Sequence, residues 1–153
     1  MSANAAEQRR PETTLAVTRG ARRLLRASGF AVLGELPLPN GRRADLVALA
    51  PDGALRIVEV KSSRADFQAD RKWADYRDYC DRFYFAAPAE LDVALFPDDA
   101  GLIVADAHGG MLAREAPVLR LAPASRRAML VRFGALAAER YCALAFGEDA
   151  FGL

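Results

Sequence analysis

The sequence predicts a single α/β domain with three layers and a mixed β-sheet. Helical and strand patterns follow one another in the order helix, three strands, helix, strand, hairpin and helix. The central strands are apolar on both faces, as in a sheet that helices cover on both sides. The length of 153 residues suits one domain. We expect residues 1–11 to form a flexible tail and residues 12–153 to form the domain.

The first helix is expected to begin at Thr13 or Thr14, either of which can cap it, and to end near Ser28 at Gly29. One side of this helix carries an apolar stripe of Leu15, Val17, Ala21, Leu24 and Leu25. The other side carries arginines at steps of three and four residues: Arg19, Arg22, Arg23 and Arg26.

Three strands come next. Residues 30–33 form a short apolar run, and residues 44–50 and 54–60 show the clearest strand patterns in the chain. Pro51, Asp52 and Gly53 join the last two strands and indicate a tight hairpin.

The second half of the domain repeats helical and strand patterns. Ser63, with Asp66 three residues later, resembles a capping box and opens a helix. The expected elements are a helix over residues 64–80, a strand over 83–87, a short helix over 90–95, a hairpin of 102–105 with 111–114, and a final helix over 124–145.

The composition excludes several classes of protein. Hydrophobic residues make up 52% of the chain, so it is not disordered. No apolar run approaches the roughly 18 residues of a membrane span, and the polar N-terminus is not a secretory signal. The single histidine excludes a multi-histidine zinc site, and Cys80 and Cys142 match no metal spacing. We therefore expect a cytoplasmic protein whose chemistry rests on carboxylates, lysine or hydroxyls.

The hairpin places two acidic residues opposite each other. If Ala50 faces Ala54, then Asp45 faces Glu59 on the neighbouring strand, with Cβ atoms about 4.5–5.5 Å apart. Lys61 lies on the same face because it is two residues beyond Glu59. Adjacent carboxylates repel, and Mg²⁺ or Mn²⁺ would remove that conflict. The alternative is an ordinary ion pair at the end of a strand.

Asp45 on one strand is followed by Glu59 and Lys61 on the next, a pattern that resembles the PD-(D/E)XK nuclease superfamily. Five segments carry a longer pattern: residues 41–46 (GRRADL), 58–63 (VEVKSS), 72–76 (KWADY), 78–81 (DYCD) and 101–107 (GLIVADA). Together these segments resemble the MmcB family of bacterial DNA repair proteins. The resemblance implies a restriction-endonuclease-like αβββαβ core, a nuclease-like metal site and a role in DNA repair.

The same resemblance assigns roles to individual residues. It makes Asp45 and Glu59 ligands of Mg²⁺ or Mn²⁺, and Lys61 the group that orients the water or the phosphate. Many superfamily members carry a further acid in the first helix, where this chain has Thr18. Glu35 is the expected replacement as catalytic residue and metal ligand. Without it, the rival interpretation is an inactive DNA-binding accessory factor of repair.

DNA is the expected partner, and other repair proteins are a second class of partner. The side chains expected to contact DNA are Arg22, Arg23, Arg26, Arg42, Arg43, Lys72 and Tyr76. For the helix arginines the alternative is an ordinary solvated face. For Tyr76 the alternative is a place in the core, and for Lys72 a solvated charge.

Overall fold

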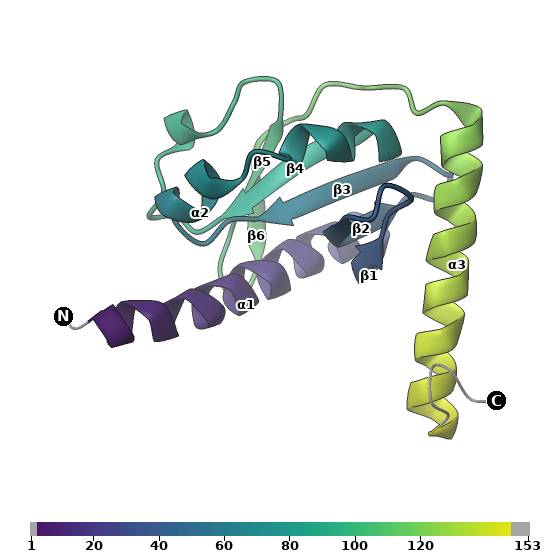
Figure 1. Cartoon of the computed structure of the whole chain (residues 1–153), viewed down its shortest axis with the longest axis horizontal. Helices are drawn as coiled ribbons and strands as arrows, with labels where there is room; N and C mark the ends of the chain where they lie inside the picture. Colours follow the sequence, from purple (N-terminus) through teal and green to yellow (C-terminus); the bar gives the residue numbers. More distant parts are fainter. Residues whose placement is uncertain (1–2, 148–153) are drawn as a thin grey trace.

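The computed structural model describes residues 3–147, which form a six-stranded mixed sheet with helices around it (Figure 1). The strands lie side by side in chain order, with β1 to β3 antiparallel, β3 to β5 parallel, and β6 antiparallel to β5. Their bounds are β1 Ala31–Pro37, β2 Arg43–Leu49, β3 Leu55–Val60, β4 Arg82–Ala87, β5 Gly101–Ala105 and β6 Gly110–Arg114. The predicted three-layer α/β fold with a mixed sheet is confirmed.

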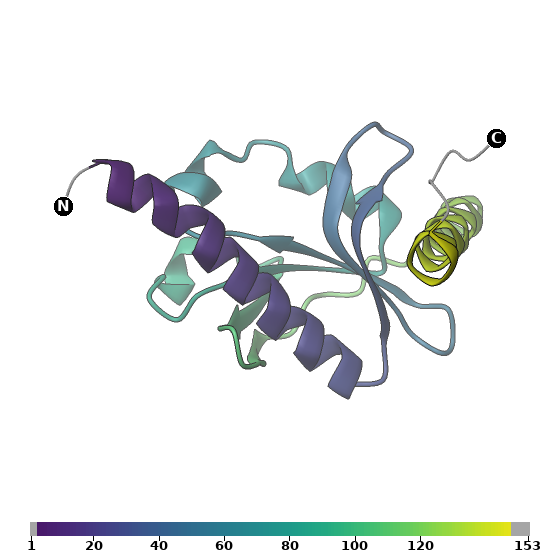
Figure 2. The same cartoon turned by 90° about the horizontal axis from the view of Figure 1, so that it is seen from below.

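Helices cover both faces of this sheet. The long helix α1 (Ala3–Ala27) crosses one face, while α2 (Arg64–Ala69) and the 3-10 helix η1 (Trp73–Tyr79) lie over the other (Figure 2). A second 3-10 helix, η2 (Val93–Leu95), lies between β4 and β5, and α3 (Pro123–Phe146) stands beside β1. Within the described residues, no helix is long and apolar enough to span a bilayer.

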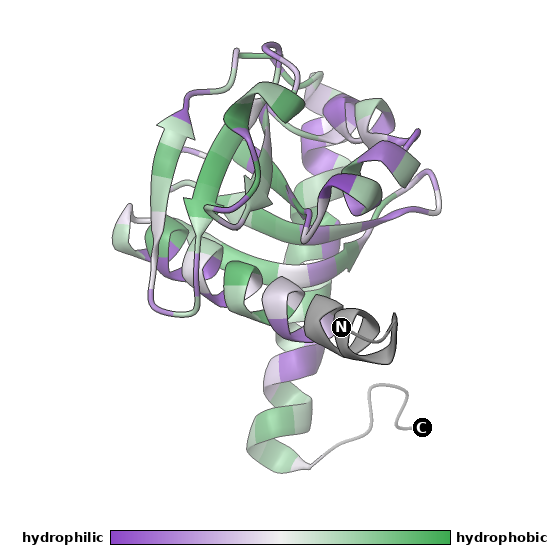
Figure 3. Cartoon of the chain, turned by 90° about the vertical axis from the view of Figure 1, so that its left-hand side faces the viewer, coloured by the Kyte–Doolittle hydropathy of each residue, from purple (hydrophilic) through white to green (hydrophobic). Residues whose placement is uncertain are grey.

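Two hydrophobic cores lie on opposite faces of the sheet, and the strands are mostly hydrophobic along their length (Figure 3). Leu46 and Val58 pack under α1, whereas Val47 and Ile57 face η1. Neighbouring residues thus enter different cores, as the strand period of two requires. Asp45, Glu59 and Lys61 share the period of Val47 and Ile57. They lie beyond the last paired residues of β2 and β3, Leu46 and Val58, where Asp45 also borders residues of α1.

The first helix begins earlier than the sequence predicts. It starts at Ala3 rather than at Thr13 or Thr14, so residues 3–11, expected as a tail, are helical. This segment is rich in Ala, Glu, Gln and Arg, which all favour helix, and α1 continues through Pro11 despite the hydrogen bond lost there. The apolar stripe of this helix begins only at Leu15, so the stripe does not indicate where the helix starts.

The helix expected over residues 64–80 is broken into two pieces. Ser63 caps α2 as predicted, because its Oγ accepts the Asp66 N–H at 3.0 Å. The helix then stops at Asp70, whose backbone is extended, with φ −81° and ψ 108°. The chain resumes as η1 at Trp73. At this break Asp70 forms an ion pair with Lys61, which directly follows β3. Helical periodicity does not predict such a contact.

Candidate functional site

The β2–β3 hairpin has the predicted register. Its turn closes through hydrogen bonds from the Gly53 N–H to the Ala50 carbonyl (3.0 Å) and from the Ala50 N–H to the Ala54 carbonyl (2.9 Å). Leu49 then pairs with Leu55. Counting outward along both strands, Asp45 comes opposite Glu59 on one face of the sheet.

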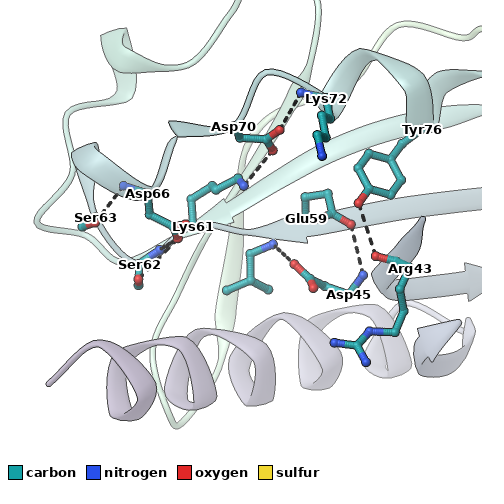
Figure 4. A network of polar contacts seen from close by, with 11 residues as sticks. Arg43, Asp45, Glu59, Lys61, Ser62, Ser63, Asp66, Asp70, Lys72 and Tyr76 are labelled. Carbon is teal, nitrogen blue, oxygen red and sulfur yellow. Dashed lines mark hydrogen bonds and ion pairs between the residues drawn. The ribbon is translucent and has the colours of Figure 1, made fainter. Parts of the chain in front are cut away.

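At this point carboxyl groups replace the backbone ladder (Figure 4). The Asp45 N–H donates to Glu59 Oε1 at 3.0 Å, and the Val60 N–H donates to Asp45 Oδ2 at 2.8 Å. Each carboxyl group is therefore anchored by one oxygen to the backbone of the opposite strand. The second oxygens, Oδ1 of Asp45 and Oε2 of Glu59, accept no backbone N–H.

Burial makes this carboxyl pair electrostatically unusual. Only 5% of Glu59 is exposed. Burial, followed by the charge of Asp45, raises the pKa of Glu59 from its usual 4.5 to about 9. Burial also raises the pKa of Asp45, although the Val60 N–H and Lys61 act in the opposite direction. The pair therefore retains a proton at neutral pH, which a solvated ion pair at the end of a strand would not do.

Lys61 is the third member of the cluster and is 7% exposed. Its N–H donates to the Ala86 carbonyl at 2.8 Å, which fixes the base of the side chain beside β4. Its Nζ lies 2.7 Å from Asp70 Oδ2. The ammonium is near enough to lower the pKa of both Asp45 and Glu59, yet its ion pair is with Asp70.

Glu35 does not join the two facing carboxyl groups. Its side chain is 67% exposed and lies 4.0 Å from the guanidinium of Arg43. In the part of the chain that the structure describes, no three His, Cys, Asp or Glu side chains gather closely enough to hold a metal ion. Glu35 lines the same groove as Asp45, but within the described residues it forms no three-acid cluster with Asp45 and Glu59, so its role as a third ligand stays a prediction. The backbone of Glu35 itself has φ +54°, and its side chain faces solvent.

A groove of about 760 Å³ opens beside Asp45. Thr18 and Arg22 of α1 line this groove together with Asp45. Asp66 also lines it, and Arg140 of α3 reaches the groove and donates to the Gly34 carbonyl. Asp45 is thus accessible from outside, whereas Glu59 lies behind it.

Residues 2–148 match the MmcB-like family, whose description is DNA repair protein MmcB-like. The chain belongs to this family. A solved structure of a protein of unknown function from Silicibacter pomeroyi is 40% identical to the chain, with a TM-score of 0.86. The match covers 91% of this chain and 97% of that one. No curated protein is similar enough to the chain to be matched.

The arginines expected to contact DNA differ in their contacts in this MmcB-like protein. Arg22 lines the groove, and Arg26 is exposed on the same helix. Arg43 is 65% exposed at the start of β2. Arg23 instead donates to the His108 carbonyl at 3.1 Å, and Arg42 donates two hydrogen bonds to Asp75, at 2.8 and 3.0 Å.

Tyr76 belongs to the core of this MmcB-like fold, so the expectation that it contacts DNA is wrong. Its ring stacks on Phe83 at 6.1 Å, and its hydroxyl donates to the Arg43 carbonyl at 3.3 Å. Burial raises the pKa of the Tyr76 hydroxyl to about 12, and the charges of Glu59 and Asp45 add to the effect. Lys72 remains exposed at the start of η1.

The sequence analysis did not identify three residues of the site: Asp66, Asp70 and Arg140. Asp66 and Asp70 have the spacing of a solvated helix face, yet Asp66 accepts the Ser62 N–H at 3.0 Å and Asp70 binds Lys61. Arg140 lies far along the chain from the acidic segment. Only the short separation of Asp66 and Asp70 from Lys61 offered a signal, and it did not distinguish contact from exposure.

Proposed function

We propose that this MmcB-like protein is a metal-dependent deoxyribonuclease of the PD-(D/E)XK type that hydrolyses DNA phosphodiester bonds. One observation carries the proposal. Asp45 and Glu59 face each other at the buried end of a sheet, with Lys61 beside them and a groove leading to Asp45. Membership of a DNA repair family supports DNA as the ligand of that groove.

The donor set fits Mg²⁺ or Mn²⁺. Both ions prefer carboxylate oxygens, and Mg²⁺ is commonly held by one or two carboxylates together with water and phosphate oxygens. Asp45 and Glu59 would hold the ion through the oxygens that accept no backbone N–H. The ion would supply positive charge to the phosphate and to the attacking water. The proposed set leaves Glu35 out, because Glu35 lies outside the pair.

The chain's own groups supply the remaining steps. Glu59 must lose the proton that burial lets it keep, since a metal ligand has to be deprotonated. The Lys61 ammonium orients the attacking water or neutralises charge that develops on the phosphate. Arg22 and Arg140, which both line the groove and both approach Gly34, hold the neighbouring backbone phosphates.

A cleavage assay with a matched pair of variants tests the proposal. Single-stranded, duplex, flap and junction DNA are incubated with Mg²⁺ or Mn²⁺. Glu59→Gln should abolish cleavage and leave the fold intact, because Gln is neutral like protonated Glu59 and still accepts the Asp45 N–H. Glu35→Gln should cleave like the wild type. Cleavage that persists in Glu59→Gln would show that the chemistry lies elsewhere.

A second candidate function is a DNA-binding accessory factor without turnover, acting with other repair proteins. Two observations favour it: Glu35 lies outside the acidic pair, and the Lys61 ammonium is bound to Asp70. This function predicts that the wild type binds DNA but cleaves none of the four forms with either metal. It also predicts that Glu59→Gln leaves DNA affinity unchanged.

A further inference from the structure

Asp70 occupies an unusual place between two helices and the end of the sheet. It ends α2, and its Oδ1 accepts the Lys72 N–H at 2.8 Å, which shapes the link to η1. Its Oδ2 lies 2.7 Å from Lys61 Nζ. The side chains of Lys61 and Asp70 are only 9% and 13% exposed, so this ion pair is largely removed from water.

The ion pair determines where the Lys61 charge lies. A lysine side chain has four flexible methylene groups, and its backbone position alone leaves the ammonium free to reach several places. The main chain of Lys61 is fixed on β4, so what remains is the direction of the side chain. In Figure 4 the ammonium turns toward Asp70, and the dashed line joins it to that carboxylate.

We infer that Asp70 is a positioning residue, whose carboxylate holds the Lys61 ammonium beside Asp45 and Glu59 rather than between them. This inference rests on the proposed function for its catalytic meaning. The arrangement keeps the ammonium away from the carboxyl oxygens that accept no backbone N–H, so that a cation can replace the proton the two groups share, while the charge of Lys61 stays close enough to act on both.

The alternative is that Asp70 only terminates α2. Burial is the largest single effect and would raise the pKa of Asp70, yet the hydrogen bond and charge of Lys61, together with the N–H groups of Lys72 and Trp73, hold that pKa below its usual value. That direction, together with the 2.7 Å contact, makes Lys61 a principal partner of the carboxylate. If Asp70 were only a helix end, neutralising it would leave the Lys61 ammonium where it is.

The chain offers a direct readout, because Lys61 and Lys72 are its only lysines. Acetylation by an N-hydroxysuccinimide ester, followed lysine by lysine in digested peptides, compares buried Lys61 with exposed Lys72. In the wild type Lys61 should react about 10- to 100-fold more slowly, as expected for an amine in a charge-assisted hydrogen bond. Asp70→Asn should remove most of this protection, and Asp70→Glu should restore much of it.

Asp78→Asn is the matched control, since Asp78 is an exposed carboxylate on η1. It should leave Lys61 protected. Circular dichroism of each variant separates local release of Lys61 from loss of the fold. Should Asp70→Asn fail to fold, folded Asp70→Glu still decides, because loss of Lys61 protection in that variant overturns the inference. Unchanged protection in folded Asp70→Asn overturns it as well.

Kinetics on a cleaved DNA substrate separate positioning from a merely structural role. Asp70→Asn should lower kcat by about 100-fold, the cost of a misplacement near 1 Å, and leave KM for DNA within about threefold. Asp70→Glu should recover part of kcat. A wild type that does not cleave, with Lys61 released in Asp70→Asn, rejects the nuclease and keeps the positioning role. Cleavage at the wild-type kcat in Asp70→Asn rejects the positioning role alone.

Discussion

The buried carboxyl group of Glu59 should make the stability of the protein depend on pH. Its pKa is 4.5 in an unfolded chain and about 9 in the folded one, so the folded state holds a proton that the unfolded state lacks between those values. Stability should therefore fall as the pH rises through this window, by up to about 1.4 kcal/mol per pH unit. Asp45, whose pKa is also raised, acts in the same direction.

Glu59→Gln should remove most of this pH dependence and make the protein more stable than the wild type at about pH 8, because a neutral amide cannot ionise. Urea unfolding at several pH values between about 5 and 9 measures the free energy of unfolding and its pH dependence. Glu35→Gln is the control, since Glu35 is solvent-exposed, and it should unfold like the wild type. A wild type whose stability is flat over this range would contradict the buried-proton account.

Among the elements, the β2–β3 hairpin could be predicted and the α2–η1 segment could not. The hairpin depends on local signals: strands with a period of two and a tight turn at residues 51–53 set the register of Asp45 and Glu59. The break at Asp70 depends on a tertiary contact with Lys61. Because helical periodicity describes one element at a time, such a break leaves no trace in it.

The packing of α1 on the sheet gives a test at the same scale. A Cβ at Gly20 would overlap the carbonyl oxygens of Asp106 and Gly109, so α1 approaches the β5–β6 turn as closely as a glycine allows. Gly20→Ala should therefore destabilise the protein by about 1–3 kcal/mol. Thermal or urea unfolding measures the change.

Gly134 of α3 provides the matched control for Gly20. Nothing lies within 4 Å of a Cβ at Gly134, so alanine there gains helix propensity without a clash. Gly134→Ala should stabilise the protein by about 0.5–1 kcal/mol. Equal effects of the two substitutions would mean that α1 does not pack against the β5–β6 turn in the way described.

For the whole molecule, the sequence predicted the family and the acidic pair but not how distant side chains meet. Arg140 reaches the groove from α3, while Arg23 and Arg42 are drawn to His108 and Asp75. These contacts join residues that are 33 or more positions apart in the chain. The local hydrophobic and charge patterns of the sequence do not predict such contacts. The sequence predicts the row of arginines on α1. It does not predict that Arg22 lines the groove while Arg23 binds the β5–β6 turn.

Arg22 lines the groove, and Arg43 lies 4.0 Å from the groove residue Glu35, so both should make DNA binding depend on salt. Each phosphate contact contributes about 0.9 to the slope of log affinity against log salt for duplex DNA. Arg22→Ala and Arg43→Ala should each reduce the slope by about that amount. Arg127→Ala, an exposed arginine at the start of α3, should not. Fluorescence anisotropy across a salt series measures the slopes, and equal slopes for all three variants would remove the groove from the DNA-binding surface.

The measurement closest to the central claim is Mn²⁺ binding by the protein without DNA, followed by electron paramagnetic resonance. If Asp45 and Glu59 form a cation site, the wild type should bind Mn²⁺, and binding should release protons because the buried pair is protonated beforehand. Glu59→Gln should lose this binding, while Glu35→Gln should keep it. Undiminished Mn²⁺ binding by Glu59→Gln, or none by the wild type at millimolar Mn²⁺, would contradict the assignment of Asp45 and Glu59 as a metal centre.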